Sequence, residues 1–237
     1  MSKKIILLFS LLVLMACSEK KSNKNLEITG YIKGLKKGTL YIQKIDDTTF
    51  IALDTIKING DSHFKSEMDI AEPEMYYLFL DRGVTNSLDN NIAFFVEKGK
   101  INIETSLEFF TGDAKITGSK NQQLYEEYKK VASRYVNQDL DLIKDSFYAK
   151  KANDLKKLEQ IENQRNKILV SKYLYTTNFA VNNAKYEVAP YVALAEIYDI
   201  NLKYLDTIQK SLTPKVAKSM YGKKLTELIQ ERKSMEK

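Results

Sequence analysis

The sequence predicts an α+β protein, in which an antiparallel β-sandwich-like domain is followed by a helical region. Between Leu26 and Gly118, apolar residues recur with a period of two in short segments separated by turn residues. From Ser119 onward the period becomes that of an amphipathic helix. The charge balance changes at the same place. Residues 17–118 carry 13 basic and 16 acidic side chains, whereas residues 119–237 carry 22 and 15.

The chain begins with a stretch that is typical of an export signal. Lys3 and Lys4 precede an apolar run, Ile5 to Met15, which is shorter than the ~20 residues that span a bilayer. Ala16 follows this run and precedes Cys17, the only cysteine of the sequence. We expect cleavage between Ala16 and Cys17.

This pattern resembles the signal of bacterial lipoproteins, although Met15 departs from the residue usual there. The resemblance implies a signal peptide over residues 1–16 and fatty acyl chains on the sulfur and the amine of Cys17. It further implies a membrane anchor in the cell envelope, and Ser18 fits sorting to the outer membrane, on either its periplasmic or its surface face. The alternative is an ordinary signal peptide followed by an unrelated cysteine.

A lipid on Cys17 would leave the mature chain without a free thiol. We therefore expect no disulfide, no cysteine nucleophile and no thiolate metal ligand. Residues 17–25 are polar and lack periodicity, so we interpret them as a tether.

Seven to nine short strands are expected over residues 26–118. Asn59-Gly60 predicts a tight turn, and the segment 63–70 alternates apolar and polar residues, which predicts one buried face. Met75 to Leu80 is continuously apolar and is expected to be buried on both faces. The other strands are expected near Leu26–Ile32, Leu40–Ile42, Phe50–Ile58, Ile92–Val96, Ile101–Thr105 and Ala114–Thr117.

Residues 119–237 predict a helical region. Two stripes indicate a long helical hairpin or arm that packs on the β domain or projects from it, with Ser119 or Asn121 as the first cap. A break is expected over Asn178 to Glu187, then a short helix after Pro190, and a last helix that starts at Thr213-Pro214. The stripes are Leu124, Tyr128, Val131 and Tyr135, and then Leu155, Leu158, Ile161, Ile168 and Leu169.

Several short motifs follow one another in a set order. In the β half they are Ile28-Thr29-Gly30-Tyr31-Ile32 with Gly34, Asp54-Thr55, Asn59-Gly60 with Phe64, Pro73 before Met75, Phe95-Val96-Glu97-Lys98-Gly99 with Ile101 and Ile103, and Ile116-Thr117-Gly118-Ser119 before Asn121. In the helical half they are Asn178-Phe179, Pro190-Tyr191-Val192, Leu205, Leu212, Ser219-Met220-Tyr221-Gly222 and Leu225.

This order resembles a domain of unknown function at the N-terminus of envelope lipoproteins, together with the segment that links it to a thioredoxin-like domain. In such proteins the thioredoxin-like domain carries a Cys-X-X-Cys motif. It would begin near Lys237, where this sequence ends, so the resemblance implies the scaffold without the redox chemistry.

We expect no catalytic constellation, no metal site and no cofactor. His63 is the only histidine and lies among polar neighbours, which favours a surface position. Asp46-Asp47 with Thr48-Thr49 could offer oxygens to a cation, but the spacing of a calcium loop is absent, and a hairpin turn is the preferred interpretation.

The helical half is basic and rich in tyrosine, and both features have two interpretations. The lysines alternate with acidic residues, which argues against nucleic acid and favours solvated helix faces, although anionic lipid or an acidic partner would also suit them. Tyrosines suit a protein-partner surface, but packing between helices and sheet is the preferred explanation. They are Tyr125, Tyr128, Tyr135, Tyr148, Tyr173, Tyr175, Tyr186, Tyr191, Tyr198, Tyr204 and Tyr221.

From the sequence we therefore expect a lipid-anchored envelope lipoprotein that acts as a non-enzymatic binding or accessory module, with a protein partner met through its helical region. One alternative is a remnant or non-catalytic subunit of a thioredoxin-like disulfide reductase, with a thioredoxin-like partner in trans. A hydrolase that brings together carboxylates from distant strands is a third alternative.

Overall fold

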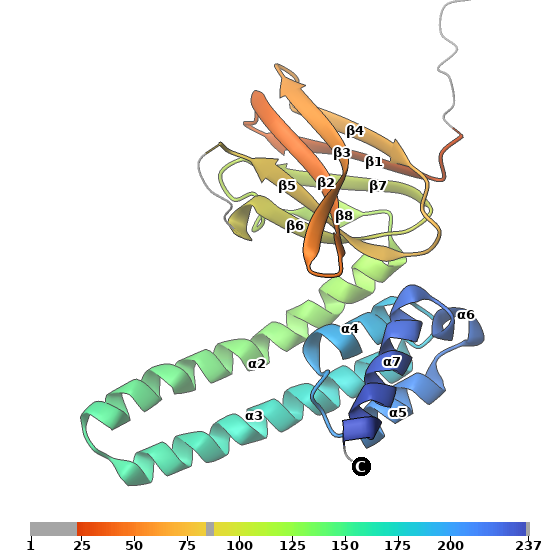
Figure 1. Ribbon diagram of the computed structural model, residues 1–237. Coiled ribbons are helices and arrows are strands. Elements are labelled where there is room, and N and C mark those ends of the chain that lie inside the picture. Colours follow the sequence, from red (N-terminus) through yellow and green to blue (C-terminus); the bar gives the residue numbers. More distant parts are fainter. Residues whose placement is uncertain (1–22, 84–87, 236–237) are drawn as a thin grey trace, which may run out of the picture.

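A computed structural model describes residues 23–83 and 88–235 (Figure 1). Eight strands form two four-stranded sheets, and helices follow them in the chain. The predicted α+β class, with a β-sandwich-like domain before a helical region, is confirmed. The predicted signal peptide over residues 1–16, the lipidation site Cys17 and the first part of the tether lie outside the described residues.

The first sheet has the strand order β4-β1-β7-β8. Contrary to the all-antiparallel prediction, β1 and β7 are parallel, whereas the other pairs of this sheet are antiparallel. The reason is that both strands enter the sheet from the same end, where the Gly99 amide donates to the Asn25 carbonyl at 2.9 Å. The strands are β1 (Leu26–Lys33), β4 (His63–Met68), β7 (Gly99–Ser106) and β8 (Lys115–Thr117).

The second sheet has the order β3-β2-β5-β6 and is antiparallel throughout. Its strands are β2 (Lys37–Asp46), β3 (Thr49–Asn59), β5 (Glu74–Asp81) and β6 (Asn91–Val96), the last preceded by the single turn η2 (Leu88–Asn90). The two sheets bury one apolar core between them, which includes Ile28, Ile42, Leu78, Phe94 and Ile101. The predicted alternation over residues 63–70 is confirmed, since Phe64, Ser66 and Ile70 are buried.

Two turn predictions have different outcomes. Asp46-Asp47 forms the β2–β3 hairpin as expected, and Asp47 takes a positive φ of 55°. Asn59-Gly60 does not close a hairpin, because β3 and β4 belong to different sheets. Gly60 has a φ of 95°, but Asn59 does not share the positive φ that a two-residue hairpin of this type needs.

The helical hairpin is confirmed, and of the two arrangements expected for it, it projects from the sandwich (Figure 1). It consists of α2 (Lys120–Lys151) and α3 (Leu155–Asn182), which we call the arm. Ser119 is the N-cap of α2, and its hydroxyl accepts from the Gln122 amide at 3.0 Å. The predicted break over Asn178 to Glu187 is too long, because α3 continues to Asn182.

Four further helices pack together beside the base of the arm. They are α4 (Val188–Glu196), α5 (Leu202–Ser211), α6 (Pro214–Ala217) and α7 (Met220–Met235). The last predicted helix is therefore two helices, and the chain turns at Lys218-Ser219 between them. Gly222 permits this turn, because a Cβ there would collide with the carbonyl oxygen of Val216.

The β domain and the helices share one apolar cluster. Met75 of β5 and Phe95 of β6 are buried in it together with residues of α2, α4 and α7. The ring of Phe95 contacts Tyr125, Tyr191 and Tyr221, with ring centroids 5.8, 5.0 and 6.3 Å away. These near-perpendicular contacts fix the base of the arm on the sheet.

Hydrogen bonds accompany this packing at the edge of the second sheet. The Phe95 amide, on edge strand β6, donates to Gln122 Oε1 at 2.8 Å. The Met75 amide donates to the Tyr221 hydroxyl at 2.9 Å. Helical side chains thus satisfy amides for which the sheet offers no strand partner.

Within residues 23–83 and 88–235, no helix is both long enough and apolar enough to cross a membrane.

The junction predicts the effect of truncating Phe95. Replacing Phe95 with Ala should lower the free energy of unfolding by about 3–5 kcal/mol, because a fully buried ring is lost from the shared cluster. Phe109→Ala is the matched control, since that ring is 60% exposed and its loss should cost less than about 0.5 kcal/mol. Urea unfolding followed by circular dichroism measures both; equal losses would contradict the packing described here.

Candidate binding site on the helical arm

The arm is held together by a stripe of side chains that α2 and α3 turn toward each other. Tyr128 is fully buried, stacks on Tyr175 at 5.6 Å and forms a hydrogen bond with the Thr176 hydroxyl at 2.9 Å. Nearer the tip, Ile161 and Ala149 are 2% and 6% exposed. We call the predicted stripe of Leu124, Tyr128, Val131 and Tyr135 the inner stripe. Its two tyrosines both contact Tyr175 of α3, so packing accounts for them.

A second apolar stripe runs along one flank of α2 and stays exposed. Its members are spaced four, three and four residues apart, so they lie on one side of the helix. We call them the outer stripe: Val136, Leu140, Ile143 and Phe147, which are 47, 56, 44 and 59% exposed. Leu169 of α3, 44% exposed, lines the same groove as Val136 and Leu140. The arm thus carries apolar side chains that none of its own elements covers.

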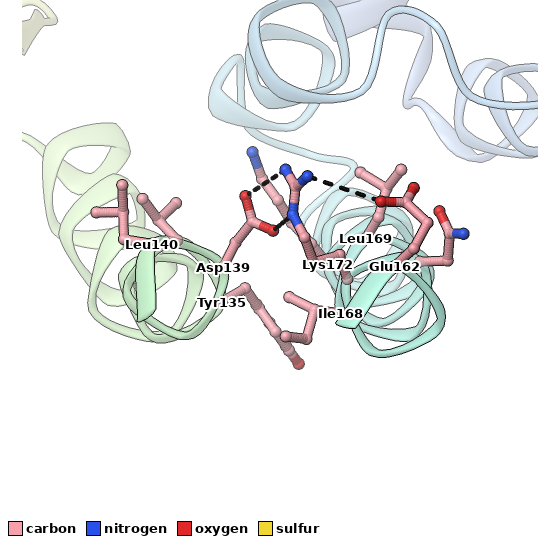
Figure 2. Close-up of a pocket in the computed structure, with 10 residues that line it drawn as sticks. Tyr135, Asp139, Leu140, Glu162, Ile168, Leu169 and Lys172 are labelled. Carbon is pink, nitrogen blue, oxygen red and sulfur yellow. Dashed lines mark hydrogen bonds and ion pairs between the residues drawn. The ribbon is translucent and has the colours of Figure 1, made fainter. Parts of the chain in front are cut away.

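The groove between the two helices opens beside this stripe and has a volume of about 360 Å³. Figure 2 shows Leu140 on the α2 side, Leu169 on the α3 side and an ion pair between them. Val136 and Asn166 also line it. Its walls are therefore partly apolar, with charged side chains at the centre.

The ion pair joins Asp139 of α2 to Arg165 of α3. Arg165 Nε and Nη2 donate to the two carboxylate oxygens of Asp139 at 2.7 and 3.2 Å, and Glu162 lies 3.9 Å from the guanidinium. The hydrogen bonds from Arg165 hold the pKa of Asp139 below its usual value. At the inner end of the groove, Lys172 forms an ion pair with Glu196 of α4 at 2.8 Å.

This arrangement suits the binding of an amphipathic segment. The groove offers an apolar strip with charged groups at its centre and rim. Grooves of this kind accept the apolar face of a helix or another amphipathic segment. Among residues 23–83 and 88–235, no group of His, Asp and Glu side chains has the arrangement of a metal site.

The residues singled out in the sequence lie apart from this groove. Ala16 and Cys17 are outside the described residues. His63 is at the surface, with its ring 4.8 Å from that of Tyr31 and Nδ1 2.7 Å from Asp61. Asp46-Asp47 forms a hairpin turn. Of the eleven tyrosines of the helical half, only Tyr148 and Tyr198 are exposed by more than half.

Another cavity, about 350 Å³, lies at the junction and is lined by Glu72, Glu97, Lys98 and Glu187 among others. The carboxylates there serve the fold. Glu97 accepts from the Lys120 amide at 2.6 Å at the start of α2, and Glu72 accepts from the Met220 amide at 2.7 Å at the start of α7. Both cap helix N-termini, where a carboxylate is stabilised.

Buried Glu187 is held at the same junction by Asn121. The Asn121 amide group donates to Glu187 and to Glu97 at 3.2 and 3.0 Å, and its oxygen accepts from the Val188 amide at 2.8 Å. A single asparagine thus links the β domain, α2 and α4.

The β domain is similar to a known domain family. Residues 26–125 match the family model of a domain of unknown function, DUF4369. No curated protein matches the sequence. The match includes all eight strands and the first turns of α2, so it includes Gln122 and Tyr125, whose side chains contact Phe95. An N-terminal domain of unknown function, as expected from the sequence, is confirmed, while the match says nothing of a lipid or of a thioredoxin-like domain.

The outer stripe was missed in the sequence because two stripes of α2 lie side by side. The four-three-four spacing of Val136, Leu140, Ile143 and Phe147 is as regular as that of the inner stripe. Only the position of α3 decides which one is covered. In α3 the predicted stripe divides in the same way, since Ile161 faces inward whereas Leu155 and Leu169 are exposed.

The Asp139–Arg165 pair predicts a pH-dependent contribution to stability. Arg165→Gln should cost at most about 1 kcal/mol at neutral pH, because both side chains are about a third exposed and water weakens the pair. The folded chain lowers the pKa of Asp139, so this stabilisation is present above the unfolded pKa of ~3.9 and disappears as the pH falls through the lower folded value.

Urea unfolding of the wild type and Arg165→Gln at neutral and strongly acid pH tests this prediction. The two proteins should converge in acid. Exposed Arg134→Gln is the control and should differ little from the wild type at either pH. A stability difference for Arg165→Gln that persists in acid would show that the guanidinium acts through packing and not through Asp139.

Proposed function

We propose that this protein is a lipid-anchored lipoprotein of the cell envelope that acts as a non-catalytic binding or accessory module. In this proposal Cys17 carries the lipid, residues 17–25 form the tether, and the β domain supports the arm. A partner protein binds along the outer stripe and the adjoining groove. Sorting to the outer membrane is part of the proposal and rests on the residues around Cys17.

The exposed outer stripe carries the proposal for a partner. Four large apolar side chains in a row on one helix flank are unusual for a solvated surface, and such patches often mark interaction sites. Their spacing repeats that of the stripe that binds α2 to α3, so an added helix could pack on them in the same manner. The charged side chains of Glu162 and Lys172, which line the groove, would orient such a helix.

The identity of the partner separates the alternatives that the sequence left open. A partner with a Cys-X-X-Cys motif would make this chain an accessory subunit of a thioredoxin-like reductase. A partner without one would favour a free-standing binding lipoprotein.

The lipid anchor predicts the effect of replacing Cys17. Cys17→Ser should abolish the mass of the added acyl chains and release the mature protein from the membrane fraction, because Cys17 is the only cysteine of the sequence. Mass spectrometry and fractionation of cells that express the full chain measure both effects. Ser18→Ala is the control and should retain lipid. An acyl mass that survives Cys17→Ser would rule out lipidation at this site.

The partner site predicts a crosslinking pattern. A photoreactive amino acid at Leu140 should capture a protein in intact cells, whereas one at Gln138 should not, because the two positions are about 160° apart around α2. Both side chains are exposed, so access to the probe is similar. Leu169, across the groove, should capture the same protein as Leu140. Equal capture from Leu140 and Gln138 would contradict a site on this flank.

A further inference from the structure

The tip of the arm, residues 144–157, exposes large apolar side chains that do not line the groove, and Phe147, the last residue of the outer stripe, is one of them. Phe147, Tyr148 and Leu155 are 59, 58 and 77% exposed. The rings of Phe147 and Tyr148 contact each other at 5.8 Å in an edge-to-face arrangement. Tyr148 and Leu155 lie outside the outer stripe, and the fold gives them no packing role.

The same tip is basic. It carries Lys144, Lys150, Lys151, Lys156 and Lys157 against Asp145 and Asp154, a net charge of +3. All five lysines are exposed, and Lys151 Nζ lies 5.5 Å from the centre of the Phe147 ring. Asp154 accepts from the Lys157 amide at 2.9 Å as the N-cap of α3, so one of the two acidic groups is already engaged by the backbone.

We propose that this tip binds an anionic phospholipid surface. Two aromatic rings and a leucine at a turn can enter the boundary between headgroups and acyl chains, while lysines beside them meet the phosphates. Each lysine near an anionic membrane surface contributes to the attraction, and salt weakens it. A basic helix end alone would be explained by solvation and by the helix dipole. Solvation and the helix dipole do not explain the exposed rings and Leu155 at the same turn. These side chains favour a surface with an apolar interior over a soluble polyanion.

This contact goes beyond the proposed lipid anchor and does not depend on it. The start of β1, which leads to Cys17, lies at the end of the sandwich where α2 begins, and α2 then runs away from the sandwich to the tip (Figure 1). The 32-residue helix α2 alone is about 48 Å long. The tip would therefore contact lipid well away from the anchoring segment.

The sequence offers a clean optical test, because it contains no tryptophan. The described buried apolar residues lie between Leu26 and Ile229, so a chain that begins at Ser18 keeps both cores and lacks Cys17. In this chain, Phe147→Trp places one fluorophore at the tip. Phe109→Trp is the matched control, since the two rings are 59 and 60% exposed and Phe109 belongs to the β domain.

With vesicles of phosphatidylcholine and phosphatidylglycerol at low salt, the emission of Phe147→Trp should shift to the blue, and that of Phe109→Trp should not. Pure phosphatidylcholine vesicles, soluble polyphosphate or high salt should give little shift. Equal shifts for both variants, no shift for either, or an equal shift with polyphosphate would overturn the proposal. None of these results depends on lipid at Cys17.

A charge series completes the test. Replacing Lys150, Lys151, Lys156 and Lys157 with Gln should lower vesicle partitioning at least about tenfold, because each lysine contributes to the attraction. The control replaces Lys210, Lys218, Lys223 and Lys224, exposed lysines of the other helices, with Gln and changes the net charge equally. Equal losses in the two variants would show that the attraction belongs to the whole basic half, which would overturn a site at the tip.

Discussion

The structure depends on how one edge of the second sheet meets the helices. Phe95 of β6 enters a cluster of tyrosine rings contributed by α2, α4 and α7, and its backbone amide donates to Gln122. An uncovered edge strand invites pairing with another chain, and here helical side chains cover part of it. Burial raises the pKa values of Tyr191 and Tyr221 well above their usual value, so their hydroxyls stay protonated in this cluster.

This junction explains why the arm has an exposed flank. The sheet contacts only the beginning of α2, and α4 to α7 pack beside the base of the arm (Figure 1). Beyond the base, the inner face of the arm is therefore closed by contacts between α2 and α3, as the stacking of Tyr128 on Tyr175 and the burial of Ile161 show. No described element is left to cover Val136, Leu140, Ile143 and Phe147. A partner along the flank and a lipid surface at the tip each follow from side chains that the fold does not need.

Much of the fold could be predicted from the sequence, because local patterns carry it. Alternation over residues 63–70 gave one buried face, and Ser119 marked the start of the helical half. The parallel pairing of β1 with β7 could not be predicted, because it depends on where the chain re-enters the first sheet. Helix α5 was not predicted, although Leu202, Leu205 and Ile208 are buried at helical spacing after the Asn201 cap.

The candidate site was less accessible to sequence reasoning. Adjacent stripes on α2 are equally regular, and only the position of α3 shows which is covered. Arg165 and Asp139 are 26 residues apart and meet only because the arm folds back on itself. The proposed role of Cys17, by contrast, rests on sequence alone, since this residue lies outside the described part of the chain.

In the structure described here, the junction holds the arm in one orientation, with its flank free for a partner. A chain that begins at Ser18 has no cysteine, so spin labels can be placed by Lys57→Cys on β3 and Lys156→Cys near the tip, both exposed positions. Pulsed electron paramagnetic resonance then measures the distance between them. An arm that the junction holds in place should give a single narrow distribution. A broad distribution, or several distances, would show an arm that pivots on the sheet and would contradict it.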